Sequence, residues 1–303
     1  MTQTVLILGA SGRFGRAADK AFSDAGWHVL RFDRKRDQLS QAACGVDVIV
    51  NAANMPYTHW AREMQAWHTQ VIDAARSTGA TVIVPGNVYV FGLESSAPWG
   101  PQTSHAASNP LGRLRVDMEA AYRASGVRTI LLRAGDFLDT SASGNWFDAI
   151  MTKRLGRGIF TYPGAPDVPH SWAYLPDLAR ACVGLAERRS ELPVYADIPF
   201  AGYTLTGAQM LAALNRVLAR PAHLRRMSWL PIQLARPVWP LARHLLEMRY
   251  LWDMPHSMDA GVLKRLLPEF VPTPVEHALA NAIPAGLARR GREVGKVAQW
   301  AEA

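Results

Sequence analysis

Residues 5–15 read Val-Leu-Ile-Leu-Gly-Ala-Ser-Gly-Arg-Phe-Gly, and this stretch decides the fold. Its four apolar residues predict a strand buried on both faces, as a parallel sheet requires. Gly9, Gly12 and Gly15 follow where this strand gives way to a helix. Glycine there permits a tight turn, a close approach of the backbone to a pyrophosphate, and close packing of helix on sheet. The stretch therefore predicts a dinucleotide-binding loop, with free amides and the positive end of the helix dipole facing the phosphates.

The first half of the chain alternates short apolar runs with helical stretches. The predicted strands that follow the first one lie at 28–32, 46–50, 81–84 and 127–132, and the predicted helices between them at 14–25, 59–77 and 111–124. Two more helices are predicted later in the chain, at 177–188 and 206–218. Gly26, Gly79 and Gly126 close the first three helices. Alternating strands and helices imply right-handed crossovers and a parallel sheet that is covered on both faces. We expect an α/β fold with a Rossmann-type doubly wound sheet.

Beyond residue 140, glycine, proline and aromatic residues become frequent and the alternation ends. We expect residues 1–140 to form an NAD(P)-binding core, with 171–200 completing it. Residues 141–170 and 201–303 would then form a smaller substrate-binding lobe. The segment 229–252 is apolar, carries several arginines and is interrupted by prolines. It is interpreted first as a lid or core segment, second as a subunit interface, and third as a membrane-surface segment.

The composition limits the function classes. The chain has 303 residues, of which 49% are hydrophobic and 19% charged, so it is an ordinary globular protein. Cys44 and Cys182 are too few for a disulfide framework, and both are expected to be buried. No apolar run is long enough for a membrane span, and no signal segment precedes the first strand, so we expect a cytoplasmic protein. No metal site is expected, because no histidine pairs with a carboxylate at a ligand spacing.

The net charge of +8 permits two interpretations. The positive charges are spread along the sequence, which favours a generally arginine-rich surface. Nucleic-acid binding rests on the charge alone and is not expected.

The end of the second predicted strand bears on the choice of cofactor. Asp33 stands where a carboxylate would accept hydrogen bonds from an adenosine ribose and favour NAD. Arg34, Lys35 and Arg36 follow it, and Arg13 lies in the glycine loop. These cations suit a 2′-phosphate, so NADP is favoured and NAD stays open.

Three further stretches carry a family resemblance. Residues 51–53 read Asn-Ala-Ala, residues 84–92 read Val-Pro-Gly-Asn-Val-Tyr-Val-Phe-Gly, and residues 133–137 read Arg-Ala-Gly-Asp-Phe. With the glycine loop and the segment 170–179, they resemble the extended or atypical short-chain dehydrogenase/reductase superfamily, in its NAD-dependent epimerase/dehydratase-like branch. The resemblance covers most of residues 1–200. It implies a Rossmann fold, a nicotinamide cofactor and hydride transfer.

The chain departs from the acid–base residues of that family. The family carries a serine or threonine, then a tyrosine, then a lysine in a Tyr-x-x-x-Lys pattern. Here Asn87 stands at the serine/threonine position, Leu111 replaces the tyrosine and Arg115 replaces the lysine. Leucine cannot transfer a proton, whereas Asn87 can orient a carbonyl and arginine can bond a ribose. Tyr89 is the first substitute proton donor, because residues two apart on an extended chain point to the same side.

The candidate residues form two groups. The catalytic candidates are Asn87, Tyr89, Arg115 and His170, with Tyr174 as a further choice. The cofactor-binding candidates are Gly9, Ser11, Gly12, Arg13, Phe14, Gly15, Asp33, Arg34, Ala52, Ala53 and Arg115. Each catalytic candidate can equally be a packed or hydrogen-bonded structural residue. Trp146, Phe160 and Trp172 are interpreted either as an aromatic pocket lining or as core.

These residues support two classes of function. One is an NAD(P)-dependent oxidoreductase or epimerase-like enzyme that acts on a small organic or sugar-nucleotide-like substrate, and a homodimer is possible. The alternative is a non-catalytic NAD(P)-binding sensor, which the loss of the tyrosine and lysine favours.

Overall fold

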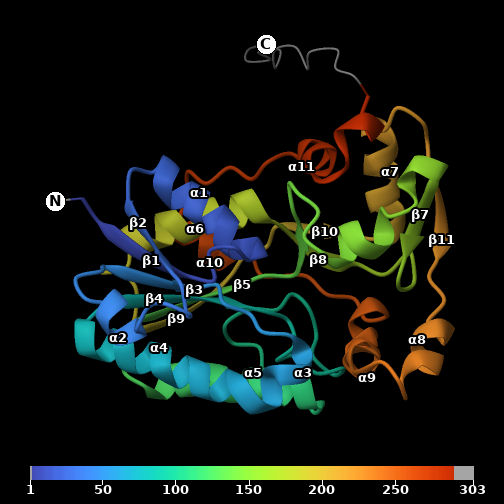
Figure 1. The fold of residues 1–303 in the computed structure, drawn as a ribbon. Helices are drawn as coiled ribbons and strands as arrows, with labels where there is room; N and C mark the ends of the chain where they lie inside the picture. The colour runs from blue at the N-terminus through green and yellow to red at the C-terminus, as the bar shows by residue number, and fades with distance from the viewer. Residues whose placement is uncertain (1, 290–303) are drawn as a thin grey trace, which may run out of the picture.

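Six parallel strands form the central sheet of the computed structural model, which describes residues 2–289 (Figure 1). In spatial order the strands are β2 (His28–Phe32), β1 (Thr4–Leu8), β3 (Val48–Asn51), β4 (Thr81–Gly86), β5 (Thr129–Arg133) and β9 (Tyr195–Pro199). The predicted Rossmann-type fold is confirmed. The strand order reverses between β1 and β3, and the crevice at such a reversal is where doubly wound sheets bind ligands.

Helices cover both faces of this sheet. One face packs against α1 (Arg13–Asp24), α6 (Leu175–Glu187) and α10 (Gly261–Leu266). The other packs against α4 (Gln65–Thr78) and α5 (Pro110–Ala124), with the short α2 (Leu39–Ala42) beside α4. Successive strand residues point to opposite faces, so each buried strand supplies both cores.

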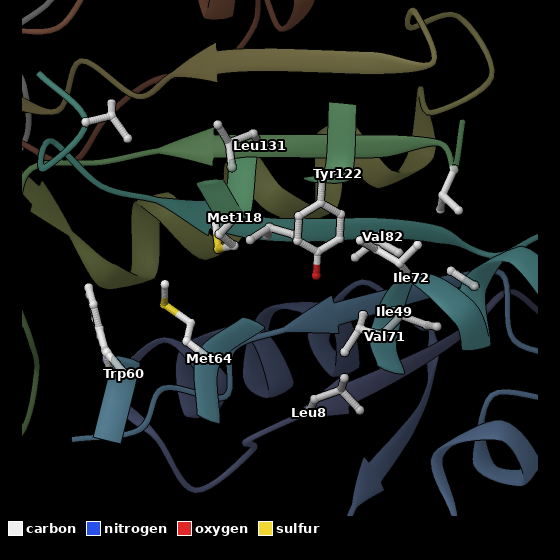
Figure 2. Close-up of a cluster of buried hydrophobic side chains, with 14 of the residues drawn as sticks. Leu8, Ile49, Trp60, Met64, Val71, Ile72, Val82, Met118, Tyr122 and Leu131 are labelled. Atoms are coloured by element: carbon white, nitrogen blue, oxygen red, sulfur yellow. The ribbon is translucent and has the colours of Figure 1, made fainter. Parts of the chain in front are cut away.

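Figure 2 shows the core under α4 and α5. Leu8, Ile49, Val82 and Leu131 come from four adjacent strands and meet Val71 and Ile72 of α4 and Met118 and Tyr122 of α5. This packing fixes α5, which carries Arg115, against the sheet.

The rest of the chain builds a third buried cluster around two small sheets. The first sheet has the strand order β10 (Tyr203–Leu205), β8 (His170–Tyr174) and β6 (Asp136–Leu138). In the second sheet, β11 (His223–Arg226) pairs in parallel with β7 (Ile159–Tyr162). They pack with α7 (Gly207–Val217) and α11 (Val275–Ala282). Phe160 and Trp172 lie in this cluster, fully buried, so they belong to the core, while Trp146 is partly buried against it. The division into a core and a lobe stays a prediction, and residues 290–303 of the predicted lobe lie outside the described part.

Short helices fill the remaining connections. They are α3 (Tyr57–His59), a π-helical turn at Trp60–Met64, another at Phe147–Met151, and 3₁₀ turns at Leu155–Arg157, Arg249–Trp252 and Ala285–Leu287. The apolar segment after residue 229 contains α8 (Leu230–Ala235) and α9 (Pro240–Glu247), each with proline in its first turn. Among residues 2–289, no helix combines the length and apolar character that a membrane crossing needs.

Most sequence-predicted elements are confirmed within two residues, including the helix predicted at 59–77, whereas the expectation that Cys44 is buried is wrong. The helix predicted at 59–77 starts earlier and is divided by the π-helical turn into α3 and α4. Cys44 is exposed, because it follows the short α2 at the surface, whereas Cys182 is buried as predicted.

Candidate active site

The glycine loop joins β1 to α1 at the point where the strand order reverses. Gly9 has φ +78°, and a Cβ there would lie 2.7 Å from the Cα of Ala53, which follows β3. A Cβ on Gly15 would overlap the carbonyl oxygen of Gly9. Gly12 is the N-cap of α1 and offers no side chain to its amides, while its own N–H donates to the Gly9 carbonyl at 2.9 Å. The loop is a bare backbone cradle at a helix N-terminus, which fits the pyrophosphate of a dinucleotide.

The other predicted residues of this loop have different surroundings. Ser11 is exposed, and its carbonyl accepts a hydrogen bond from Arg16 at 2.9 Å. The Phe14 side chain is buried in the core under α1, so only its backbone can face a ligand. Ala52 and Ala53 pack against the loop from the end of β3.

The Arg13 side chain reaches away from α1 to another segment. Its Nε and one terminal nitrogen donate to the carbonyls of Ser143 and Gly144, both at 2.8 Å. Arg16 adds bonds to Asp139 at 3.4 Å and to the Ser141 hydroxyl at 3.3 Å. The segment 139–144 is therefore fastened to the first turns of α1, next to the glycine loop.

Asp33 follows β2 at the predicted ribose position. Its Oδ1 accepts the Lys35 backbone N–H at 2.9 Å, and its Oδ2 lies 3.6 Å from Nε of Arg36. Arg34 is exposed and, among the described residues, pairs with no carboxylate. The predicted excess of cations is thus smaller than the sequence indicates, because Arg13 and Arg36 already have partners.

Asn87 and Tyr89 lie in a turn that follows β4, which ends at Gly86. The expectation of an extended chain here is wrong. The Asn87 Oδ1 accepts the Tyr89 backbone N–H at 3.0 Å, as in a turn initiated by asparagine. The Asn87 carbonyl accepts a hydrogen bond from Arg133 at 2.7 Å. This turn, and not strand alternation, sets the direction of both side chains.

A buried ion cluster holds that turn in place. Arg133 of β5 binds Glu119 of α5 and Asp197 of β9, each with a shortest distance of 2.7 Å. These carboxylates raise the pKa of Arg133 despite the opposing effect of burial. His105 lies 3.5 Å from Glu119, so His105, Glu119 and Asp197 bring ligand-type atoms together. The guanidinium between the two carboxylates supplies the positive charge that a metal ion would bring.

Tyr89 is paired with Tyr57, a residue that the sequence did not single out. Their hydroxyl oxygens lie 2.6 Å apart, and Tyr57 is brought there by α3. Burial raises the pKa of both phenols, and the nearby carboxylate of Asp136 raises them further. Both phenols are therefore neutral at physiological pH and can donate protons. The missed signal was local: a tyrosine directly after Pro56 in the loop that leaves β3.

Arg115 and Leu111 lie on the inner face of α5. Leu111 is buried in the core, where the family resemblance expects a tyrosine. Arg115 is also buried; it donates to the Pro85 carbonyl at 2.7 Å and lies over the Trp60 ring at 5.7 Å. Its Nε–H is buried and has no hydrogen-bond partner among residues 2–289. A buried, unpartnered donor beside β4 is what a cofactor or substrate oxygen would satisfy.

His170 is held in a chain of polar side chains behind the crevice. Its Nε2 lies 2.8 Å from Oδ2 of Asp136, and its Nδ1 lies 3.2 Å from Nε2 of His256. Its ring stacks on Trp252 at 4.3 Å. Both ring nitrogens of His170 are engaged, and its partner Asp136 is one-third exposed. Tyr174, the further choice, is buried, and its hydroxyl accepts a hydrogen bond from Asn281 at 3.2 Å.

The helix α9 lies close to these groups. His244 packs against the Tyr57 ring at 6.3 Å, and Glu247 accepts the Leu111 backbone N–H at 2.6 Å. Further on, Trp252 is buried and Tyr250 bonds the Phe91 carbonyl at 3.0 Å. The second half of the segment 229–252 is thus packed beside the candidate site, as its first interpretation proposed.

The structure resembles solved structures of epimerases and a dehydrogenase. UDP-glucose 4-epimerase from Brucella ovis, in complex with NAD, matches 95% of this chain and 100% of its own at TM-score 0.72 and 18% identity. UDP-glucuronic acid 4-epimerase from Bacillus cereus, in complex with UDP-glucuronic acid and NAD, matches 92% and 98% at TM-score 0.71 and 15% identity. L-threonine dehydrogenase from Phytophthora infestans matches 92% and 97% at TM-score 0.71 and 15% identity. At these identities the likeness shows the fold.

Sequence comparison matches a much smaller part of the chain than the structural comparison does. No protein-family model matches the chain. Sulfoacetaldehyde reductase 2 from Chromohalobacter salexigens is 44% identical over 43 residues, which is 14% of this chain and 17% of that protein. The chain therefore matches about a sixth of that relative's length.

Proposed function

We propose that this chain is an NAD(P)-dependent oxidoreductase or epimerase-like enzyme of the short-chain dehydrogenase/reductase superfamily. Its substrate is a small organic or sugar-nucleotide-like molecule with a carbonyl or hydroxyl group. The observation that carries the proposal is the bare glycine cradle at the reversal of strand order, packed against Ala53. Solved structures of similar fold that contain NAD support the same cofactor class.

The side chains around the crevice suit the reduction of a carbonyl. A nicotinamide cofactor held at the glycine loop would supply the hydride that reduces the carbonyl carbon. Tyr89 donates its phenolic proton to the carbonyl oxygen and regains a proton from solvent through Tyr57, whose hydroxyl lies 2.6 Å away. Asn87 orients the carbonyl, and Arg115 bonds the ribose or the substrate through its unpartnered Nε–H. Asp136, fixed by His170, binds substrate hydroxyl groups.

The first test is cofactor binding. Gly12→Val places a branched side chain in the cradle, so we expect NADH and NADPH binding to weaken more than tenfold in calorimetric titration. Gly286→Val is the matched control, since a Cβ there meets no atom within 4 Å. Binding of neither nucleotide to the wild-type chain would refute the proposal.

The choice of cofactor follows from Arg34. We propose that NADP is preferred, because Arg34 is exposed beside Asp33 and has no carboxylate partner among residues 2–289. A hydrogen bond from a charged group contributes about 1.5–3 kcal/mol. Arg34→Ala should therefore weaken NADPH binding roughly 10- to 100-fold and leave NADH binding nearly unchanged. Equal losses for both nucleotides would contradict a contact with the 2′-phosphate.

A non-catalytic sensor is the second candidate, and the buried Leu111 favours it. It predicts nucleotide binding without consumption of cofactor. Nicotinamide absorbance, followed over a panel of aldehydes, ketones and nucleotide sugars, separates the two: turnover of any substrate excludes the sensor. The free cysteines Cys44 and Cys182 suit the cytoplasmic location expected from the sequence. A homodimer stays a prediction.

A further inference from the structure

The first half of the segment after residue 229 leaves apolar side chains in solvent. Leu230 and Leu234 are 56% and 71% exposed, and they share one face of α8 because they are four residues apart. Val238 and Trp239, in the turn before α9, are 86% and 40% exposed. Four large apolar residues within ten positions form an exposed ledge, whereas the other large exposed apolar residues are scattered singly. Single exposed apolar residues are ordinary, but a contiguous group marks an interaction site.

A basic depression is lined in part by the residues that directly precede α8 in the chain. It is lined by Lys153, Arg154, Arg225 and Arg226, with Met227 and Ser228 leading on to α8, and its volume is about 240 Å³. Among residues 2–289, none of these four cations lies within salt-bridge distance of a carboxylate. Four unpaired cations around one hollow attract an anionic group of phosphate size.

The charge around the ledge has one sign. Its flanking cations, Arg236 and Arg243, are exposed and also lack a carboxylate partner among the described residues. From residue 220 to residue 249 the sequence has six arginines and one carboxylate, Glu247, whose Oε1 accepts the Leu111 N–H. In Figure 1, β11 and α8 follow one another along the side of the molecule opposite β2 and α2. The segments that carry the ledge and part of the depression are therefore neighbours on the side of the molecule away from β2.

We propose that this surface, the depression of Lys153, Arg154, Arg225 and Arg226 together with the ledge of Leu230, Leu234, Val238 and Trp239, docks the chain on an anionic membrane. A bilayer interface suits both the depression and the ledge, because lipid phosphates attract the cations and the aliphatic side chains insert at the boundary between headgroups and acyl chains. Trp239, half-exposed at the end of the ledge, suits the headgroup level. Nucleic acid would leave Leu234 and Val238 in water, and a protein partner would need an acidic, apolar surface of matching shape. The proposal does not depend on the cofactor or on the reaction.

Vesicle binding tests it with the full chain. We expect sedimentation with vesicles of phosphatidylglycerol and phosphatidylcholine, little binding to phosphatidylcholine alone, and release by added salt. The double variant Arg225→Glu/Arg226→Glu should bind at least about 25-fold less, because each basic residue lost costs about fivefold and each added carboxylate repels the anionic lipid. The matched control, Lys264→Glu/Arg265→Glu, changes the net charge equally at two exposed positions of α10 and should bind as the wild type.

A second pair of variants tests the ledge. Leu234→Gln/Val238→Gln should weaken vesicle binding roughly tenfold, because apolar area no longer enters the interface. Leu93→Gln/Val271→Gln, which are 67% and 72% exposed elsewhere, is the control. Circular dichroism of all four variants checks that each is folded.

Several outcomes overturn the proposal. The first is that the wild type does not bind anionic vesicles, and the second is that the α10 control loses as much vesicle binding as Arg225→Glu/Arg226→Glu. The third is that the wild type is a dimer and that Leu234→Gln/Val238→Gln dissociates it. The last would assign the ledge to contact between two copies of the chain. Binding of an RNA or DNA duplex that requires Arg225 and Arg226, without vesicle binding, would assign the depression to nucleic acid.

Discussion

The paired phenols of Tyr57 and Tyr89 differ chemically from the family's acid–base group. In the resembled family a lysine lowers the pKa of the tyrosine, whereas here burial and Asp136 raise the pKa of both phenols. A neutral phenol donates a proton to a developing alkoxide but is a poor base. We therefore expect reduction of a carbonyl to be faster than oxidation of the alcohol at neutral pH.

Tyr89→Phe removes the proposed proton donor. We expect kcat to fall roughly 10²- to 10⁴-fold, the usual contribution of a positioned acid, with little change in nucleotide affinity. Steady-state kinetics with the best substrate of the panel and a nucleotide titration make the measurement.

The control for that variant is Tyr195→Phe. The Tyr195 hydroxyl is buried without a partner among residues 2–289, so its loss removes no hydrogen bond that the structure contains. Tyr57→Phe should slow kcat about fivefold or more, because one hydrogen bond to Tyr89 is lost. Unchanged kcat in Tyr89→Phe would exclude this residue as the donor.

At the scale of elements, β1 and α1 could be predicted from the sequence alone. The apolar run and three glycines are contiguous, and the geometry they require is local: a tight turn at Gly9 and a close helix at Gly15. The sequence could not place Tyr57, Asp136 or His256 in one site, because they come from three segments that only the folded chain brings together. The direction of Tyr89 was argued wrongly, because the strand ends at Gly86 and an asparagine turn follows.

The tie between α1 and the segment 139–144 carries a prediction about nucleotide release. Arg13 fastens that segment beside the glycine loop through two bonds of 2.8 Å. Arg13→Ala should speed amide hydrogen exchange in residues 139–145 and raise the nucleotide dissociation rate about tenfold, in line with the loss of charged hydrogen bonds.

Exchange mass spectrometry and stopped-flow displacement make these measurements. Arg76→Ala, which removes an exposed pair with Asp73 on α4, is the control. Unaltered exchange in residues 139–145 would show that the two bonds do not hold the segment.

The whole molecule combines three buried clusters, and the polar groups inside them set its response to acid. His68 and His256 are both buried between elements that are distant in sequence. Burial, aided by Arg115, holds the pKa of His68 at about 3. Burial and the neighbouring His170 also lower the pKa of His256 well below its ordinary value. Each is therefore neutral in the folded chain, and His68 Nδ1 lies 2.9 Å from the Tyr122 hydroxyl.

These depressed values predict how stability depends on pH. Below about pH 6.5 the unfolded chain takes up a proton at each histidine that the folded chain does not, so the free energy of unfolding falls with falling pH. Above that pH each histidine is neutral in both the folded and the unfolded state, so it no longer lowers the free energy of unfolding. Between pH 6 and 5 the loss approaches about 1.4 kcal/mol per pH unit for each histidine. Urea unfolding at a series of pH values from 8 to 5 should show this slope.

His68→Gln separates the contribution of one histidine. We expect lower stability at pH 8, because the bonds to Asn51 and Tyr122 are altered, but a slope between pH 6 and 5 that is smaller by about 1.4 kcal/mol per pH unit. His28→Gln, at an exposed position of β2, controls for the loss of a histidine as such. If His68→Gln keeps the full slope, His68 is charged in the folded chain. The Asn51–His68–Tyr122 contacts would then have to hold a cation against the repulsion of Arg115.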